Sequence, residues 1–256
     1  MKIDVNSDMG EGFGVYQLCD DEALMKVVSS ANIACGFHAG DPAIMTRMVR
    51  LAKARGVGIG AHPGLPDRQG FGRKELPFSP DEICQQVIYQ LGALSAIARA
   101  EGTRVSHVSF HAAMGNIINR DESLAMQVMQ AIARLDAELI IFSQPDTHTE
   151  RAALAAGLKS LTLFLADRAY DKHGQLVPRS IPGSVIKDDA AVRARVRQFL
   201  QEGMVNTFDG TLLPLRARSI LVHSDTPGSV ELATLVRSEI EANGAEVAPA
   251  ASVLAE

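Results

Sequence analysis

The chain has 256 residues, of which 46% are hydrophobic and 21% charged, which suits one large α/β domain or two small ones. Its net charge of -5, with lysines and arginines scattered, argues against a nucleic-acid or anionic-membrane surface. No apolar stretch is long enough to span a bilayer, Met1 to Asn6 alternate like a strand rather than a signal peptide, and three unpatterned cysteines suit a reducing compartment, so we expect a cytoplasmic protein.

Strand-like and helix-like segments alternate along almost the whole chain. Seven segments have the apolar character of buried strands: Lys2–Asn6, Asn32–Cys35, Val57–Ala61, Val105–Phe110, Glu138–Phe142, Ser160–Leu165 and Ser219–His223. Helical spacing and capping signals predict helices over 20–30, 42–55, 79–101, 121–135, 147–156 and 188–202, and a last one that ends near Ala242. We also expect a hairpin around Asp209-Gly210 and a loosely held alanine-rich tail after Gly244.

This alternation predicts an α/β fold in which helices cover a parallel sheet. The seven strand-helix units come close to the eight of the familiar closed barrel. No Gly-x-Gly-x-x-Gly motif follows the first strand, so the chain fits a dinucleotide-binding fold poorly. We therefore expect a closed or nearly closed parallel (β/α) barrel, with residues 1–256 forming a single domain.

Histidines and carboxylates collect directly after the predicted strands. Since the carboxyl ends of barrel strands meet at one mouth, these side chains should lie together. Such groups bind a divalent metal or perform general acid-base chemistry, and the residue types leave both open. The catalytic candidates are Asp8, Glu11, His38, His62 and His111. For a metal ion the candidate ligands are Asp8, His38 and His62.

Other polar residues near the strand ends are candidates for substrate binding. Arg73 ends the long loop that follows His62, and the length and glycine content of this loop predict that it covers the mouth. Asp167-Arg168 is open to a reading as a structural ion pair at the rim. The substrate-binding candidates are Asn6, Arg73, Asn116, Arg179, His223 and Asp225.

Several blocks of this sequence resemble the signature blocks of the LamB/YcsF lactam-utilisation family, to which the A subunits of 5-oxoprolinase belong. The resemblance runs from about Lys2 to Gly244. Its blocks are Ala31-Asn-Ile-Ala-Cys-Gly-Phe-His-Ala-Gly-Asp-Pro42, Gly60-Ala-His-Pro-Gly64, Gly70-Phe-Gly-Arg73, Asp167-Arg-Ala-Tyr170, Leu176-Val-Pro-Arg179 and His223-Ser-Asp-Thr-Pro-Gly228.

The resemblance implies a seven-stranded barrel of the glycoside hydrolase/deacetylase type. It also implies cleavage of the lactam 5-oxo-L-proline to L-glutamate, coupled to ATP hydrolysis, together with the B and C subunits of 5-oxoprolinase as partners. The chain contains no Gly-x-x-x-x-Gly-Lys-[Ser/Thr] phosphate loop, so we expect the partners to handle ATP at least in part. A divalent metal and a homo-oligomer are further expectations that the sequence does not decide.

One block departs from the family pattern Lys-Pro-His-Gly-Ala-Leu-Tyr-Asn. Here it reads Ser109-Phe-His-Ala-Ala-Met-Gly-Asn116, which keeps the histidine and the last asparagine but replaces the lysine and the tyrosine. Two other functions therefore stay open beside the lactamase. One is a metal-dependent deacetylase or amidohydrolase that acts on a small N-acyl substrate, and the other is a catalytically weakened binding subunit.

Overall fold

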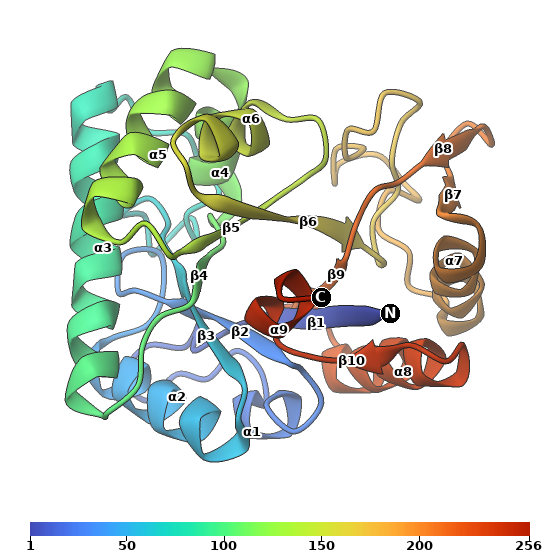
Figure 1. Ribbon diagram of the computed structural model, residues 1–256, viewed down its shortest axis with the longest axis horizontal. Helices are drawn as coiled ribbons and strands as arrows, with labels where there is room; N and C mark the ends of the chain where they lie inside the picture. Colours follow the sequence, from blue (N-terminus) through green and yellow to red (C-terminus); the bar gives the residue numbers. More distant parts are fainter.

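Seven parallel strands close into a barrel in the computed structural model, which describes all residues 1–256 (Figure 1). The last barrel strand pairs back onto the first, which confirms the predicted architecture. In order around the barrel the strands are β1 (Lys2–Met9), β2 (Ser30–Ala34), β3 (Gly58–His62), β4 (His107–Val108), β5 (Ile140–Ser143), β6 (Lys159–Leu165) and β9 (Ser219–Val222).

Helices surround the barrel, and most begin at the capping residues that the sequence predicts (Figure 1). The Asp41 side chain accepts two backbone N–H bonds at one helix start, and Ser79 and Glu82 form a capping box at the next. The helices are α1 (Asp21–Leu24), α2 (Pro42–Arg55), α3 (Pro80–Ala100), α4 (Ala112–Arg120), α5 (Glu122–Leu135), α6 (His148–Ala155), α7 (Asp189–Glu202), α8 (Ser229–Ala242) and α9 (Ala250–Leu254). No helix is both long and apolar enough to cross a membrane.

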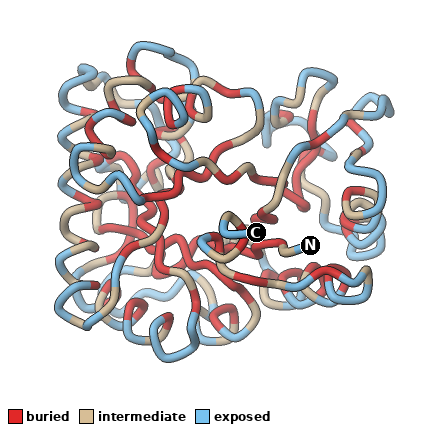
Figure 2. The backbone as a smooth tube through the Cα atoms, viewed as in Figure 1, coloured by how far each residue is buried: buried red, intermediate tan, exposed pale blue.

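Buried residues follow the ring of strands and the inner faces of the helices (Figure 2). Strands β2 and β5 are buried along their whole length, as expected where a parallel barrel has helices outside and side chains inside. A small antiparallel hairpin, β7 (Met204–Asn206) with β8 (Leu212–Pro214), lies outside the barrel where the sequence predicts one.

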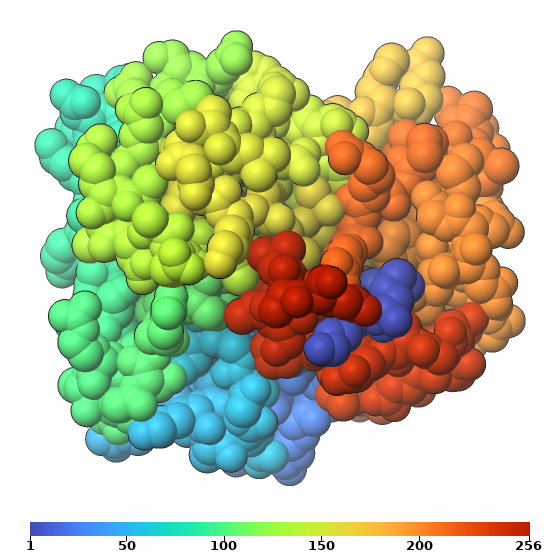
Figure 3. Space-filling view, in the orientation of Figure 1, coloured from blue at the N-terminus to red at the C-terminus, as the bar shows by residue number.

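The chain ends are packed, so the prediction of a loosely held tail is wrong. Strand β10 (Glu246–Val247) pairs with the start of β1, and α9 follows it. Ala250 and Val253 bury their side chains, and in Figure 3 this segment covers the middle of the face beside the N-terminus. Alanine is a small apolar residue with high helix propensity, so the composition suits a plug at the barrel floor.

Two other local predictions need correction. The helix expected over residues 20–30 is only the short α1, because Ser29 and Ser30 are needed as hydroxyl donors to the buried carboxylate of Asp4. Helix α4, which directly follows His111, was not predicted.

A chain of hydrogen bonds runs through the barrel interior toward the mouth. His107 Nε2 lies 3.0 Å from the Asn32 side-chain oxygen, and the Asn32 amide donates to Asp8 Oδ1 at 3.0 Å. The same amide donates to Asn6, so the Asn32 oxygen must accept a proton from His107. Burial lowers the pKa of His107 to about 3, and the ring is therefore neutral.

Gly60 makes room for His107, because a Cβ at this position would lie 2.0 Å from His107 Nε2. We expect Gly60→Ala to lower the free energy of unfolding by about 1–3 kcal/mol through overpacking. The matched control is Gly92→Ala, in helix α3, where a Cβ meets nothing within 4 Å. This control should stabilise by about 0.4–1 kcal/mol. Urea unfolding curves measure both, and equal stability of the two variants would contradict the packing described.

Candidate functional site

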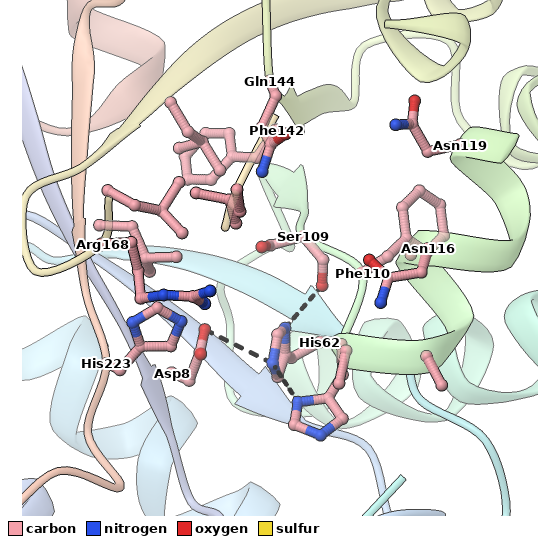
Figure 4. Close-up of a pocket in the computed structure, with 18 of the residues that line it drawn as sticks. Asp8, His62, Ser109, Phe110, Asn116, Asn119, Phe142, Gln144, Arg168 and His223 are labelled. Carbon is pink, nitrogen blue, oxygen red and sulfur yellow. Dashed lines mark hydrogen bonds and ion pairs between the residues drawn. The ribbon is translucent and has the colours of Figure 1, made fainter. Parts of the chain in front are cut away.

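A cavity of about 530 Å³ opens at the carboxyl ends of the strands. Figure 4 shows its labelled side chains, which come from the ends of several strands and from helix α4. The catalytic candidates Asp8, Glu11, His62 and His111 line it, together with residues from the long loops. The strand-end pattern in the sequence thus brings these residues together.

Two backbone carbonyls fix the proton positions of His62 and His111. His62 Nδ1 lies 2.6 Å from the Ser109 carbonyl oxygen, and His111 Nε2 lies 2.8 Å from the Phe71 carbonyl oxygen. A carbonyl oxygen only accepts, so both of these nitrogens carry protons. The other two nitrogens, His62 Nε2 and His111 Nδ1, face each other at 3.0 Å. In neutral rings both are bare lone pairs, an arrangement that a bound cation or an additional proton would stabilise.

A buried carboxylate and a third histidine complete this cluster. Glu11 Oε1 lies 3.4 Å from His111 Nδ1 and 3.2 Å from His38 Nε2. The donor atoms of Glu11, His38, His62 and His111 all lie within 4.8 Å of one another. Burial, followed by the negative charges of Asp8 and Asp225, raises the pKa of Glu11 well above its usual range. Burial likewise lowers the pKa of His111 to about 3.

This donor set fits a divalent transition metal. Three imidazoles and a carboxylate match the ligands that zinc takes in proteins, and backbone carbonyls behind two of the rings orient them as outer partners do in such sites. His38 contributes Nε2 from behind Glu11, while its ring stacks on His111 at 3.8 Å between centroids. His38 does not line the cavity, so its expected catalytic role is an indirect one.

A second ionisable pair lies on the β6 and β9 side of the mouth. His223 Nδ1 bonds the Asp167 carboxylate at 3.0 Å. Burial alone would lower the pKa of His223, but the charge of Asp167 and this hydrogen bond outweigh it and raise that pKa. Asp167 therefore pairs with His223 and not with Arg168, which corrects the ion pair considered from the sequence.

The long loop after β3 reaches across the mouth to β9. Arg73 from this loop forms an ion pair with Asp225, and its guanidinium lies over the Phe71 ring. Both charged groups line the cavity, so they close one side of it. The loop thus holds a wall of the site in addition to supplying the Phe71 carbonyl for His111.

The structure places the other predicted residues differently from one another. Asn116 and Arg179 line the cavity. Asn6 does not: it is fully buried two residues before Asp8 and bonds Ser219 and Asn32. Its expected contact with substrate is therefore replaced by a supporting position beneath Asp8.

Sequence reasoning missed a wall of polar and aromatic residues on the far side of the cavity. Asn119 follows Asn116 by one helical turn, a spacing that would have placed it on the same face had α4 been predicted. Phe110 occupies the space beside Gly115, where an added Cβ would meet Phe110 atoms at 3.2–3.3 Å. The missed lining residues are Phe110, Asn119, Phe142, Gln144, Thr147, Thr149 and Arg168.

Comparison with known proteins places this architecture in a family. A family model described as "LamB/YcsF family" matches residues 3–255. The chain belongs to the LamB/YcsF family. A relative from Pectobacterium atrosepticum, named as the A subunit of 5-oxoprolinase, is 73% identical, covering 100% of this chain and 99% of the relative. A relative from Agrobacterium fabrum, named as the second such subunit, is 68% identical, with 98% of each chain covered.

Solved structures agree with the family assignment. The "Lactam Utilization Protein" from Thermus thermophilus superposes with a TM-score of 0.92 at 42% identity, covering 97% of this chain and 99% of that one. A "putative cellobiose-phosphate cleavage protein" from Enterococcus faecalis has a TM-score of 0.57 at 16% identity over 98% of each chain, and shares the fold alone.

The Asp167–His223 pair predicts a pH-dependent contribution to stability. The raised pKa of His223 makes this contribution complete below about pH 6.5 and lost as the pH rises through the folded-state value. The lowered pKa of Asp167 makes it present above about pH 3.9. We expect Asp167→Asn to cost about 1.5–3 kcal/mol near pH 5–6 and clearly less at pH 9, as measured by urea unfolding. A cost that does not change with pH would show that the pair is not ionic.

Proposed function

We propose that this protein is the A-type subunit of a 5-oxoprolinase, in which it binds 5-oxo-L-proline and opens its lactam. Water adds to the lactam carbonyl, the C–N bond breaks, and the nitrogen takes a proton, which yields L-glutamate. The observation that carries the proposal is the cluster of Glu11, His62 and His111 at the mouth of a barrel whose family relatives bear this name. Such clusters activate water and polarise carbonyl groups.

We further propose a divalent metal ion held by Glu11, His62 and His111, with His38 behind them. The sequence alone suggested Asp8, His38 and His62, and the facing lone pairs of His62 and His111 support the revised set. When bound, such an ion lowers the pKa of a bound water and polarises the lactam carbonyl. Asp8 Oδ1 lies 3.4 Å from His62 Nε2 and adds negative charge at the same point.

The remaining groups of the site have separate proposed roles. His223 carries the proton for the departing lactam nitrogen, because its Nδ1 is held by Asp167 and it lines the cavity. Asn116 faces the substrate from α4, while Arg73 and Asp225 close the mouth and keep bulk water out. The ring of Phe71 packs at the edge of His111 and supports the same closure.

ATP hydrolysis is proposed to occur in a complex with B-type and C-type subunits. Opening an unstrained five-membered lactam benefits from coupling to ATP, and the relatives are named as one subunit of an enzyme, which supports an assembly with further subunits. We also propose a cytoplasmic location and a single domain over residues 1–256. One connected cluster of 63 buried apolar residues supports the single domain.

A metal-dependent deacetylase or amidohydrolase is the second candidate, favoured by the three-histidine cluster. It would act on a small N-acyl substrate without ATP or partners. The third candidate, a weakened binding subunit, is favoured by Ser109 and Gly115, since Phe110 fills space beside Gly115. Activity in the complex distinguishes the three.

The metal proposal predicts tight binding of one zinc or cobalt ion per chain, measured by isothermal titration calorimetry. His111→Ala and Glu11→Gln should each weaken binding more than about 10-fold, since each removes a proposed ligand. His173→Ala is the control, because His173 is exposed and outside the cavity. Binding that all three variants retain would contradict the proposed site.

The function predicts ATP-dependent release of L-glutamate from 5-oxo-L-proline by the protein together with its co-encoded partner subunits. His62→Ala should lower kcat at least about 100-fold, the scale of a general acid-base or metal-ligand contribution. Release of acetate from small N-acetyl compounds by the protein alone, with no glutamate formed in the complex, would favour the deacetylase. Binding of 5-oxoproline without turnover would favour the weakened binding protein.

A further inference from the structure

Arg168 is a buried cation that has no carboxylate partner. Only 6% of the residue is exposed, and it follows directly on the end of β6. Its Nε donates to the Ser184 carbonyl at 3.3 Å and its Nη2 to the Val177 carbonyl at 2.6 Å. Carbonyl dipoles satisfy the N–H groups but carry no full negative charge, so the guanidinium charge is left uncompensated.

The carboxylates nearby are already engaged. Asp167 bonds His223, and Asp225 pairs with Arg73 across the mouth. No carboxylate oxygen lies within 4.0 Å of the Arg168 guanidinium. A second cation, Arg179, lines the same cavity and forms no ion pair in the structure. This side of the cavity therefore has an excess of positive charge.

Figure 4 shows where this charge lies relative to the rest of the site. Arg168 and His223 lie together on one side of the cavity, across from Asn116 and Phe110, and His62 lies below them. The acidic and metal-ligating cluster and the arginines thus occupy different parts of one cavity. A ligand that spans both parts needs an anionic group at one end and a carbonyl at the other.

We propose that Arg168, assisted by Arg179, binds the carboxylate of the lactam substrate and so directs its ring carbonyl toward Glu11 and His62. This assignment rests on the proposed function. A substrate carboxylate would compensate the buried charge, and the guanidinium fork is suited to carboxylate oxygens. Because two backbone carbonyls hold Arg168 in place, little side-chain entropy is lost when the anion binds. Arg73, the candidate from the sequence, is less suited because Asp225 already neutralises it.

Two ring compounds test the proposal. 5-Oxo-L-proline carries the carboxylate, and 2-pyrrolidinone is the same lactam ring without it. Calorimetry on the protein, alone and with its partner subunits, should show a preference of about 10- to 100-fold for 5-oxo-L-proline, the scale of hydrogen bonds to a charged group. Arg168→Leu should remove most of this preference and leave 2-pyrrolidinone binding unchanged. Arg168→Lys, which keeps the charge but not the fork, should retain part of the preference and also serves if the leucine variant fails to fold.

Arg195→Leu is the matched control. Arg195 is also largely buried and donates to two backbone carbonyls, those of Asn206 and Arg168, but it does not line the cavity. It should lose stability and keep the full preference for 5-oxo-L-proline. An unchanged preference in both Arg168 variants would overturn the assignment.

The other outcomes separate this assignment from the proposed function. Wild-type protein that binds neither lactam would contradict the function itself. Inorganic phosphate is a third probe, because an arginine pair also suits the phosphoryl oxygens of a nucleotide. If Arg168→Leu abolishes phosphate binding while the preference for 5-oxo-L-proline survives, the carboxylate assignment is wrong and the anion is a phosphoryl group.

Discussion

The site depends on two backbone carbonyls, those of Ser109 and Phe71, which hold protons on the outer nitrogens of His62 and His111. The inner nitrogens are thereby forced to face each other as bare lone pairs when the rings are neutral. That arrangement is unfavourable by itself and becomes favourable around a cation, so the fold stores a binding site in its backbone geometry. Each carbonyl belongs to a segment following a strand, which ties the chemistry to closure of the barrel.

The barrel interior supports this arrangement from below. His107 donates to Asn32, and the Asn32 amide in turn donates to Asp8 beside His62. The polar chain has room only because Gly60 lacks a side chain. On the other side of the mouth, Asp167 orients His223, so the cavity has a cluster suited to activating water and a separate group suited to donating a proton.

Much of this could be predicted from the sequence, because strand periodicity and residues after strand ends report barrel geometry directly. The seven strands and the gathering of Asp8, His62 and His111 follow from that pattern. Side-chain partners do not follow, since pairing depends on distances across the barrel: Asp167 was read against Arg168 and pairs with His223 instead. The tail was misread because composition does not reveal that Val253 packs on the barrel floor.

The central claim is that one cavity holds a lactam with its carbonyl at the histidine cluster and its carboxylate at the arginines. A crystal structure of the protein with 5-oxo-L-proline tests this most directly. We expect the lactam oxygen beside Glu11, His62 and His111, and the carboxylate within hydrogen-bonding distance of Arg168. A ligand bound in the opposite orientation, or outside the cavity, would contradict the claim.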